Sequence, residues 1–242
     1  MKKVIISHKN IGETPLECLE RERVSNNIDD STPMTYAGRL DPMAEGVMIF
    51  LIDEECKNKE KYLGLNKEYE IEIVLGLKTD SYDTLGIILD VNIKRLSKKE
   101  IDFNKYIGKF EQKYPIYSSK TLNGIQLHEY ARKNKKIEQM PKKEVEIFSI
   151  KNIGRRSISG KEMAENIIER INKIKGDFRQ IEIISKWKDF MRDFGGVYFS
   201  IIKLKVKCSS GVYMRVLAEN IGNDTHVGAI ACSINRTKIG EF

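Results

Sequence analysis

Histidine and cysteine are scarce in this chain of 242 residues, and neither has the spacing of a metal site. The three histidines, His8, His128 and His226, form no H-E-x-x-H pair or comparable ligand set. The four cysteines lack the C-x-x-C spacing of zinc and redox sites, so we expect reduced structural thiols in a cytoplasmic protein. They are Cys18, Cys56, Cys208 and Cys232. We therefore expect no bound metal.

Long apolar runs and the common nucleotide and hydrolase motifs are also missing. No run approaches the ~20 apolar residues that cross a bilayer, and the apolar run near the N-terminus is too short for a secretory signal. We find no G-x-S-x-G elbow, Walker loop or dinucleotide fingerprint. Only 5 prolines and no repeats or low-complexity linkers occur, which favours one compact unit over two independent domains. Any chemistry must rely on carboxylates, arginines and aromatic side chains.

Positive charge is in excess. Lys and Arg number 42 against 35 Asp and Glu, a net charge of +7. An apolar content of 40% with 32% charged residues is ordinary for a globular protein. The basic balance favours a polyanionic partner such as nucleic acid, although many basic proteins bind none.

The hydrophobic patterns predict both strands and helices. Short apolar or alternating runs predict strands at 3–7, 44–53, 66–91 with a loop closed by Gly86, 143–154 and 197–210. Helical spacing predicts helices at 14–26, 97–112, 160–176 and 211–224, and within the second half of 114–134. Thr14 and Pro15 are the expected N-cap and first residue of the first helix. The segment around Trp187 has no clear period.

The stretch "TYAGRLDPMAEGV", residues 35–47, places an acid directly before a predicted buried strand. Asp41 lies between Leu40 and Pro42, and an Asp-Pro pair ordinarily initiates a turn. An apolar neighbour, flanking glycines and the strand behind it place this acid on a loop at the edge of a core. Asp41 therefore either shapes a turn or does chemistry.

Five blocks of the sequence resemble, in order, the motifs of TruB-type pseudouridine synthases. "GRLDPMAEGV" is similar to G-x-L-D-P-x-A-x-G-V, and "KEYEIEIVLGLKTDSYDTLG" to K-x-Y, L-G, T-D and D-x-x-G. "YPIYSSKTLNGIQLHEYAR" is similar to P-x-Y-S-A-x-K, G and Y-E-x-A-R. "VKCSSGVYMRVLAENIG" and "INRTKIGEF" resemble C-S-x-G-T-Y-I-R-x-L-x-x-D-L-G and L-R-R-T-x-V-G-x-F. The blocks leave out mainly residues 150–200.

The resemblance implies a fold, a reaction and a substrate. The implied fold is α+β, a mixed and largely antiparallel sheet flanked by helices, with the active-site cleft across it. The implied reaction isomerises uridine to pseudouridine in RNA without a cofactor, and the expected substrate is tRNA at uridine 55 of the T arm. We expect no membrane and no obligate protein partner.

Three residues match the family's catalytic positions. Asp41 would attack the glycosidic carbon or manage its C1′ or C2′ proton, and one carboxylate can suffice because detached uracil delocalises its charge. Arg215 would pair with Asp41, and a guanidinium can hold a carboxylate bidentately. Tyr69 would pack against the base and help at C5. Without the resemblance, Arg215 would be an exposed helix arginine and Tyr69 a core residue.

Five more residues match positions near the RNA. Tyr36 replaces the family histidine that stacks on flipped-out RNA, a role that an aromatic side chain can retain. Ile234 aligns with an apolar residue of the pocket and Lys9 with a lysine near the site. Lys120 and Arg132, in the segment resembling an RNA-clasping thumb, would contact phosphates. Each of these charges could equally be a solvated surface group.

The chain also departs from the family pattern. Arg39 gives a G-R-L-D sequence more typical of the RsuA and RluA types, while Asn10 and Asn235 replace an expected proline and arginine. We expect a single catalytic domain over 1–242, with an atypical insertion at about 160–195 and no C-terminal PUA-like RNA-binding domain. This insertion, rich in Lys and Arg, either compensates for that domain or decorates the surface.

Three other functions stay open at this point. One is a pseudouridine synthase for another tRNA or rRNA site. Another is a non-catalytic RNA-binding or RNA-chaperone protein with the same fold, which intact Asp41, Tyr69 and Arg215 disfavour. The third is an unrelated carboxylate hydrolase, for which the sequence offers no evident second acid.

Overall fold

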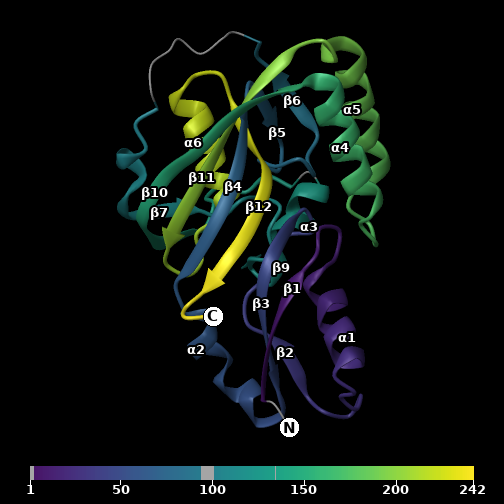
Figure 1. Ribbon diagram of the computed structural model, residues 1–242, viewed down its shortest axis with the longest axis vertical. Helices are drawn as coiled ribbons and strands as arrows, with labels where there is room; N and C mark the ends of the chain where they lie inside the picture. Colours follow the sequence, from purple (N-terminus) through teal and green to yellow (C-terminus); the bar gives the residue numbers. More distant parts are fainter. Residues whose placement is uncertain (1–2, 94–100, 134) are drawn as a thin grey trace.

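A mixed, largely antiparallel sheet organises the protein, whose computed structural model describes residues 3–93, 101–133 and 135–242 (Figure 1). In these ranges eight strands form the main sheet in the order β1-β3-β12-β4-β11-β10-β7, with β2 paired to β3. All of these pairings are antiparallel except that of β12 with β3. The strands are β1 (Val4–Lys9), β2 (Met34–Tyr36), β3 (Ala44–Ile52), β4 (Lys67–Leu75), β7 (Gly108–Lys113), β10 (Lys142–Ser159), β11 (Tyr198–Cys208) and β12 (Ala229–Ile239). The expected α+β fold class is confirmed.

Helices and short strand pairs complete the fold. The α-helices are α1 (Pro15–Ser25), α2 (Lys59–Leu63), α3 (Leu127–Arg132), α4 (Gly160–Asn172), α5 (Gln180–Phe194) and α6 (Met214–Asp224). The short strands are β5 (Leu77–Thr79), β6 (Ile88–Val91), β8 (Thr121–Leu122) and β9 (Ile125–Gln126), and the 3-10 turns are η1 (Asp53–Asn58) and η2 (Asn104–Tyr106). Helix α1 begins where predicted: Thr14 accepts a hydrogen bond from the Glu17 backbone N–H at 3.1 Å, and the Glu17 carboxylate accepts one from the Thr14 N–H.

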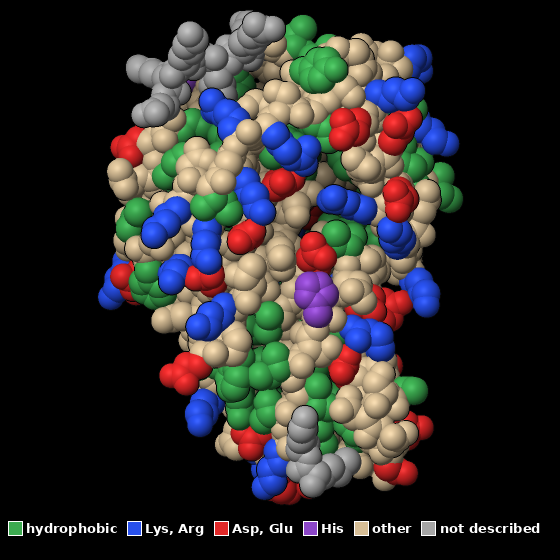
Figure 2. Space-filling view, in the orientation of Figure 1, with side chains coloured by type: hydrophobic (Ala, Val, Ile, Leu, Met, Phe, Trp, Pro, Cys, Tyr) green, Lys and Arg blue, Asp and Glu red, His purple; other side chains and the backbone are tan. Residues whose placement is uncertain are grey.

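The central strand β4 has the predicted alternation. Its apolar residues, from Tyr69 to Leu75 at every second position, are buried. The intervening glutamates face the lysines of the neighbouring strand β11, with Glu70 2.8 Å from Lys203 and Glu68 2.7 Å from Lys205. Basic and acidic side chains are similarly interspersed over the face seen in Figure 2. The polar face of this strand is thus covered by cross-strand ion pairs.

Helices cover both faces of the sheet. On one face, buried residues of α6 such as Leu217 and Ile221 pack in one core with Ile71 and Ile73 of β4. On the other face, α4 and α5 lie side by side over the end of the sheet (Figure 1), in a second core that includes Val74 of β4. Both faces of β4 are therefore buried near its C-terminal end.

The predicted helix over 97–112 is wrong for the residues that the structure describes. Positions 97–100 lie outside the described residues, Asn104–Tyr106 form the turn η2, and Gly108–Lys113 form the edge strand β7 paired with β10. Gly108 has a φ of +111°, which a helix cannot contain. The apolar spacing that suggests a helix arises because this turn and this strand each direct apolar side chains inward.

The segment around Trp187, left unassigned from sequence, is the helix α5. Trp187 is fully buried, and its indole N–H donates to the Thr84 carbonyl oxygen at 3.2 Å. Ile183 and Phe190 are buried on the same face and pack against α4 and the sheet. Residues 160–195 hold eight basic and seven acidic side chains, so their net charge is near zero. This segment builds a second core over the end of the sheet.

The sequence predicts no metal site, no membrane-spanning segment and reduced thiols. Within the described ranges, no cluster of His, Cys, Asp and Glu could hold a metal ion. No helix in those ranges is long and apolar enough to cross a bilayer. The four cysteines carry free thiols, with Cys18 and Cys208 buried.

Candidate active site

A cavity of about 1050 Å³ opens beside the loop that carries Asp41. Its walls come from many parts of the chain, among them the loop from β2 to β3, strands β4 and β12, the loop after β5, the segment 114–132, the loop between α4 and α5, and the start of α6. Asp41, Tyr69 and Arg215, distant in the sequence, all line it. The fold thus brings together the three residues predicted to be catalytic.

The loop of Asp41 is held by backbone contacts at both ends. The Asp41 carbonyl accepts from the Ala44 N–H at 3.0 Å, and the Pro42 carbonyl accepts from the Gly12 N–H at 2.8 Å. Gly46 has a φ of +119°, and a Cβ there would lie 2.3 Å from the backbone oxygen of Arg236. Only glycine allows β3 to approach β12 so closely.

Arg215 is the cation of the site. Its side chain is 3% exposed, and its Nε lies 2.8 Å from Oδ2 of Asp41, whose side chain is 41% exposed. Nη1 donates to the Ser81 carbonyl oxygen at 2.9 Å and Nη2 to that of Tyr117 at 3.1 Å. The ion pair with Asp41 is made through Nε, while each Nη atom donates to a backbone carbonyl oxygen. These carbonyls fix the guanidinium with its Nε beside the acid, in an ion pair whose N–H is not aligned for a hydrogen bond.

A second acid, Asp83, also faces Arg215, with Oδ2 3.5 Å from Nε and a side chain only 8% exposed. Burial raises the pKa of Asp83 to about 6, against the stabilising charge of Arg215. Ser81 Oγ and the Leu85 N–H donate to its Oδ1 at 2.6 and 2.9 Å. Sequence reasoning found no second acid here, although Asp83 stands in the quoted D-x-x-G block.

Aromatic and apolar side chains line the remainder of the cavity. Tyr69 is buried on β4, and burial raises the pKa of its phenol. Tyr213 packs edge-on against Tyr114 with ring centroids 5.7 Å apart, and burial raises its pKa to about 12. Ile234 and Tyr36 line the cavity as expected. Both tyrosines stay neutral, so these walls offer flat aromatic surfaces to a base.

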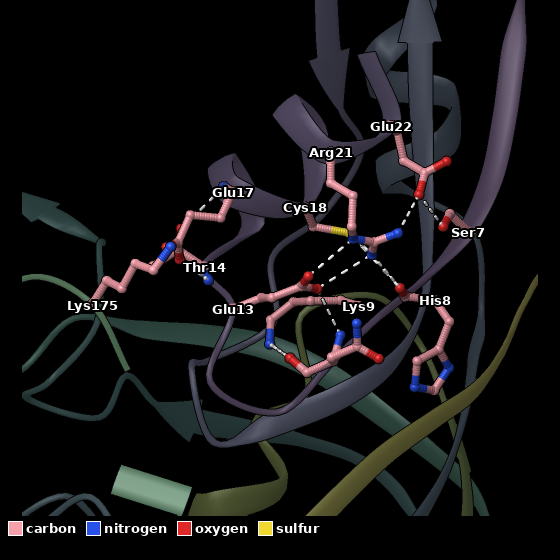
Figure 3. Close-up of polar contacts among 11 residues, drawn as sticks. Ser7, His8, Lys9, Glu13, Thr14, Glu17, Cys18, Arg21, Glu22 and Lys175 are labelled. Atoms are coloured by element: carbon pink, nitrogen blue, oxygen red, sulfur yellow. Dashed lines mark hydrogen bonds and ion pairs between the residues drawn. The ribbon is translucent and has the colours of Figure 1, made fainter. Parts of the chain in front are cut away.

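Of the three basic residues predicted to bind RNA, only one lines the cavity. Lys9 does not line the cavity: it is fully buried, burial lowers its pKa to about 8, and its Nζ donates to the Ala44 carbonyl oxygen at 2.6 Å. It lies near the foot of α1 beside Glu13 (Figure 3). Lys120 is exposed, with Nζ 5.3 Å from the Tyr114 ring, and lies outside the cavity. Arg132 lines the cavity.

The cavity wall also holds cations that the sequence did not indicate, among them Arg236 and Arg179. Arg236 is 2% exposed, and its Nε donates to the Val47 carbonyl oxygen at 2.8 Å. Its Nη2 has no hydrogen-bond partner among the described residues. Arg179 reaches the cavity from the loop between α4 and α5. Arg236 stands in the quoted "INRTKIGEF" block, whereas no local signal marks Arg179.

Comparison with known proteins identifies relatives of this chain. Residues 30–164 match the model of the family described as TruB family pseudouridylate synthase (N terminal domain). The tRNA pseudouridine synthase B of Chloroherpeton thalassium is 26% identical, covering 98% of this chain and 83% of that protein. The tRNA pseudouridine synthase B of Mycoplasma capricolum is 30% identical, covering 86% of this chain and 58% of that protein.

Solved structures share the fold at low identity. A Cbf5-Nop10-Gar1 complex contains a chain that matches with a TM-score of 0.58 and 16% identity, over 98% of this chain and 48% of that one. An H/ACA RNP bound to a substrate RNA containing 2′-deoxyuridine matches with a TM-score of 0.55 and 15% identity, over 98% and 47%. The resemblance therefore extends over the whole described fold.

Proposed function

Since this chain belongs to the TruB family of pseudouridylate synthases, we propose that it isomerises uridine to pseudouridine in tRNA, at uridine 55 of the T arm. The ion pair of Asp41 and Arg215 inside an aromatic-lined cavity is the observation that carries this proposal. The named relatives are tRNA pseudouridine synthases, which supports a tRNA substrate. With that substrate we propose a cytoplasmic location.

The cavity suits a base that has left its stack. Flipping a nucleotide out of folded RNA costs a few kcal/mol, which contacts in the pocket must offset. Tyr69 and Tyr213 offer stacking surfaces and Ile234 an apolar one. A volume of about 1050 Å³ exceeds the space needed for one uracil base, leaving room for its sugar and flanking phosphates.

Asp41 is the group placed to act at the sugar. It is about two-fifths exposed, so its carboxylate can reach a bound nucleoside while Arg215 holds its orientation from behind. In the proposed reaction Asp41 attacks C1′ or removes the C2′ proton, and the N1–C1′ bond breaks. The uracil then turns, and C5 bonds to C1′ as the Asp41–C1′ bond breaks or, on the second route, as Asp41 returns the proton to C2′. The proton then leaves C5, and N1 gains one. Tyr69 lies against the base as it turns.

Asp83 does not act as a second catalytic acid in this proposal. It is more deeply buried than Asp41 and faces the same guanidinium, and two hydrogen bonds occupy its Oδ1. A glycoside hydrolase needs a carboxylic acid beside the leaving oxygen. A base that leaves as delocalised uracil needs none, so one exposed carboxylate fits an isomerase better than a hydrolase.

The test uses unmodified tRNA transcripts and the purified chain alone. Wild-type protein is expected to form pseudouridine at position 55 without any added protein, while Asp41→Asn forms none and still binds the transcript. Asp90→Asn, which alters an exposed acid on β6, is the matched control. Product at another uridine would contradict the assignment to uridine 55. Binding without product on any tRNA would overturn the enzymatic function and favour a non-catalytic RNA-binding protein.

A further inference from the structure

The tip of the hairpin formed by α4 and α5 reaches the active-site cavity. Asp177, Phe178 and Arg179 line the same cavity as Asp41 and Arg215. Both helices bury their apolar faces against the sheet, which fixes the base of this hairpin. A rigid base lets the tip hold other segments in place.

Arg179 makes three contacts at this tip. Its Nη1 donates to Oδ2 of Asp80 at 2.7 Å and its Nη2 to Oδ1 at 3.2 Å, which makes a bidentate ion pair. Its guanidinium carbon lies 4.1 Å from the ring centroid of Tyr117. The Tyr117 hydroxyl in turn donates to Oδ2 of Asp80 at 3.1 Å. Since Arg179 and Asp80 are about one-fifth exposed, the three side chains form a closed and partly desolvated cluster.

The partners of Arg179 belong to the two segments that hold Arg215. The residue after Asp80 is Ser81, whose carbonyl oxygen accepts from Nη1 of Arg215. The carbonyl oxygen of Tyr117 itself accepts from Nη2. Arg179 thus ties together the loop after β5 and the segment before β8, at the points where both contact the catalytic pair.

We propose that Arg179 is a positioning residue for the reaction proposed above. Through Asp80 and Tyr117 it fixes the two carbonyl oxygens that direct Arg215 toward Asp41. The inference rests on the proposed function, and it assigns to the segment 160–195 a defined task at the active site. Arg179 itself is not required to touch the RNA.

The backbone at this position is consistent with that task. Arg179 has a φ of +62° and a ψ of 27°, a left-handed conformation that costs a non-glycine residue energy. Its N–H donates to Oδ1 of Asp177 at 3.2 Å, and the Phe178 N–H donates to Oε1 of Gln180 at 2.8 Å. Glycine would adopt this turn more easily, so the side-chain contacts of Arg179 are what offset the strain.

A second contact from the tip is weaker. Asp177 pairs with Arg132 of α3 at 3.1 Å, but their side chains are 79% and 37% exposed. Exposed pairs of this kind contribute little and are screened by salt. Arg132 also donates to the backbone carbonyl oxygen of Asp177. The contact of Arg179 is less exposed, and it is the one that reaches the carbonyl oxygens holding Arg215.

The experiment separates the chemical step from RNA binding. Single-turnover pseudouridine formation at saturating protein is compared for wild type, Arg179→Ala, Arg179→Lys and the control Arg192→Ala, which removes an exposed arginine of α5. A misplacement of about 1 Å at a reacting group can cost about 100-fold in rate. We expect Arg179→Ala to slow the saturated rate at least ~10-fold with little change in Kd. Arg179→Lys recovers part of the rate, because a lysine keeps the charge but loses the bidentate contact.

A double-mutant cycle tests the route through Asp80. In an Asp80→Asn background, Arg179→Ala should slow the saturated rate no further. An unchanged saturated rate in both Arg179 variants overturns the inference while the proposed function stands. A weaker Kd with an unchanged saturated rate also overturns it, since Arg179 would then be an RNA contact. If wild type forms no pseudouridine on any tRNA, the proposed function fails and this inference fails with it.

Discussion

Replacing Arg215 by methionine tests the electrostatics of the site, because it leaves Asp83 buried without its cation. Breaking a buried ion pair by removing one partner costs on the order of 3–5 kcal/mol. Ser81 Oγ and the Leu85 N–H would remain as donors to Asp83, so the carboxyl group stays hydrogen-bonded but loses its countercharge. We therefore expect Arg215→Met to lower the free energy of unfolding by about this amount at pH 7.5.

The loss should depend on pH in a defined direction. The folded-state pKa of Asp83 is raised from 3.8 to about 6, so the folded protein binds this proton more tightly than the unfolded chain. This group therefore lowers stability as pH rises from 3.8 through about 6. Loss of Arg215 raises the pKa of Asp83 further, because Arg215 lowers it in the wild type. The loss of stability is therefore smaller at pH 5, where Asp83 is protonated in both proteins, than at pH 7.5, by up to about 1.36 kcal/mol for each pKa unit of that rise.

Urea unfolding at pH 5 and pH 7.5 measures the loss in the free energy of unfolding and its dependence on pH. Trp187, the single tryptophan, is fully buried and donates to the carbonyl oxygen of Thr84, next to Asp83, so its fluorescence reports on this region. The double variant Asp83→Asn/Arg215→Met should regain stability at pH 7.5, and Arg192→Met should behave as wild type. An equal loss at both pH values, or no recovery in the double variant, would refute the reasoning.

Two further predictions concern the support of the Asp41 loop. Gly46→Ala should destabilise the protein by several kcal/mol, because its Cβ would meet the Arg236 backbone at 2.3 Å, whereas Gly196→Ala, where nothing lies within 4 Å, should be nearly neutral in thermal melts. Lys9 has its pKa lowered from 10.5 to about 8, so wild type should gain stability relative to Lys9→Met as pH rises from 8 to 10. Denaturant unfolding across that range checks the sign, and a constant difference between the two proteins would contradict it.

Local signals in the sequence predicted much of the secondary structure. The capping residue Thr14 and the alternation of Tyr69 with glutamates act over a few residues, so they can be recognised without the fold. The wrong helix over 97–112 and the unassigned segment around Trp187 show the limit of such local signals. Gly108 interrupts an apolar spacing that two different elements produce together, and the burial of Trp187 depends on the sheet beneath α5.

The residues of the site were recognised more completely than their contacts. Asp41, Tyr69 and Arg215 stand in motifs that resemble those of a known family, and all three line one cavity. Lys9 was predicted to bind the substrate, but it lies inside the core, where it supports the Asp41 loop, and it does not line the cavity. The Lys and Arg of 160–195 were noted from composition, whereas the balancing acids and the second core that this segment builds were not predicted.

The sequence by itself determined the fold class, the family and the loop that carries Asp41, because short-range patterns and motifs encode them. Only the tertiary structure decided how Arg215 is held, that Asp83 shares its charge, and that Arg179 reaches the same cavity. These facts depend on strand register and on the docking of helices, which join residues far apart in the chain. Burial then shifts the pKa of polar groups such as Asp83 and Lys9, whose burial no local pattern indicated.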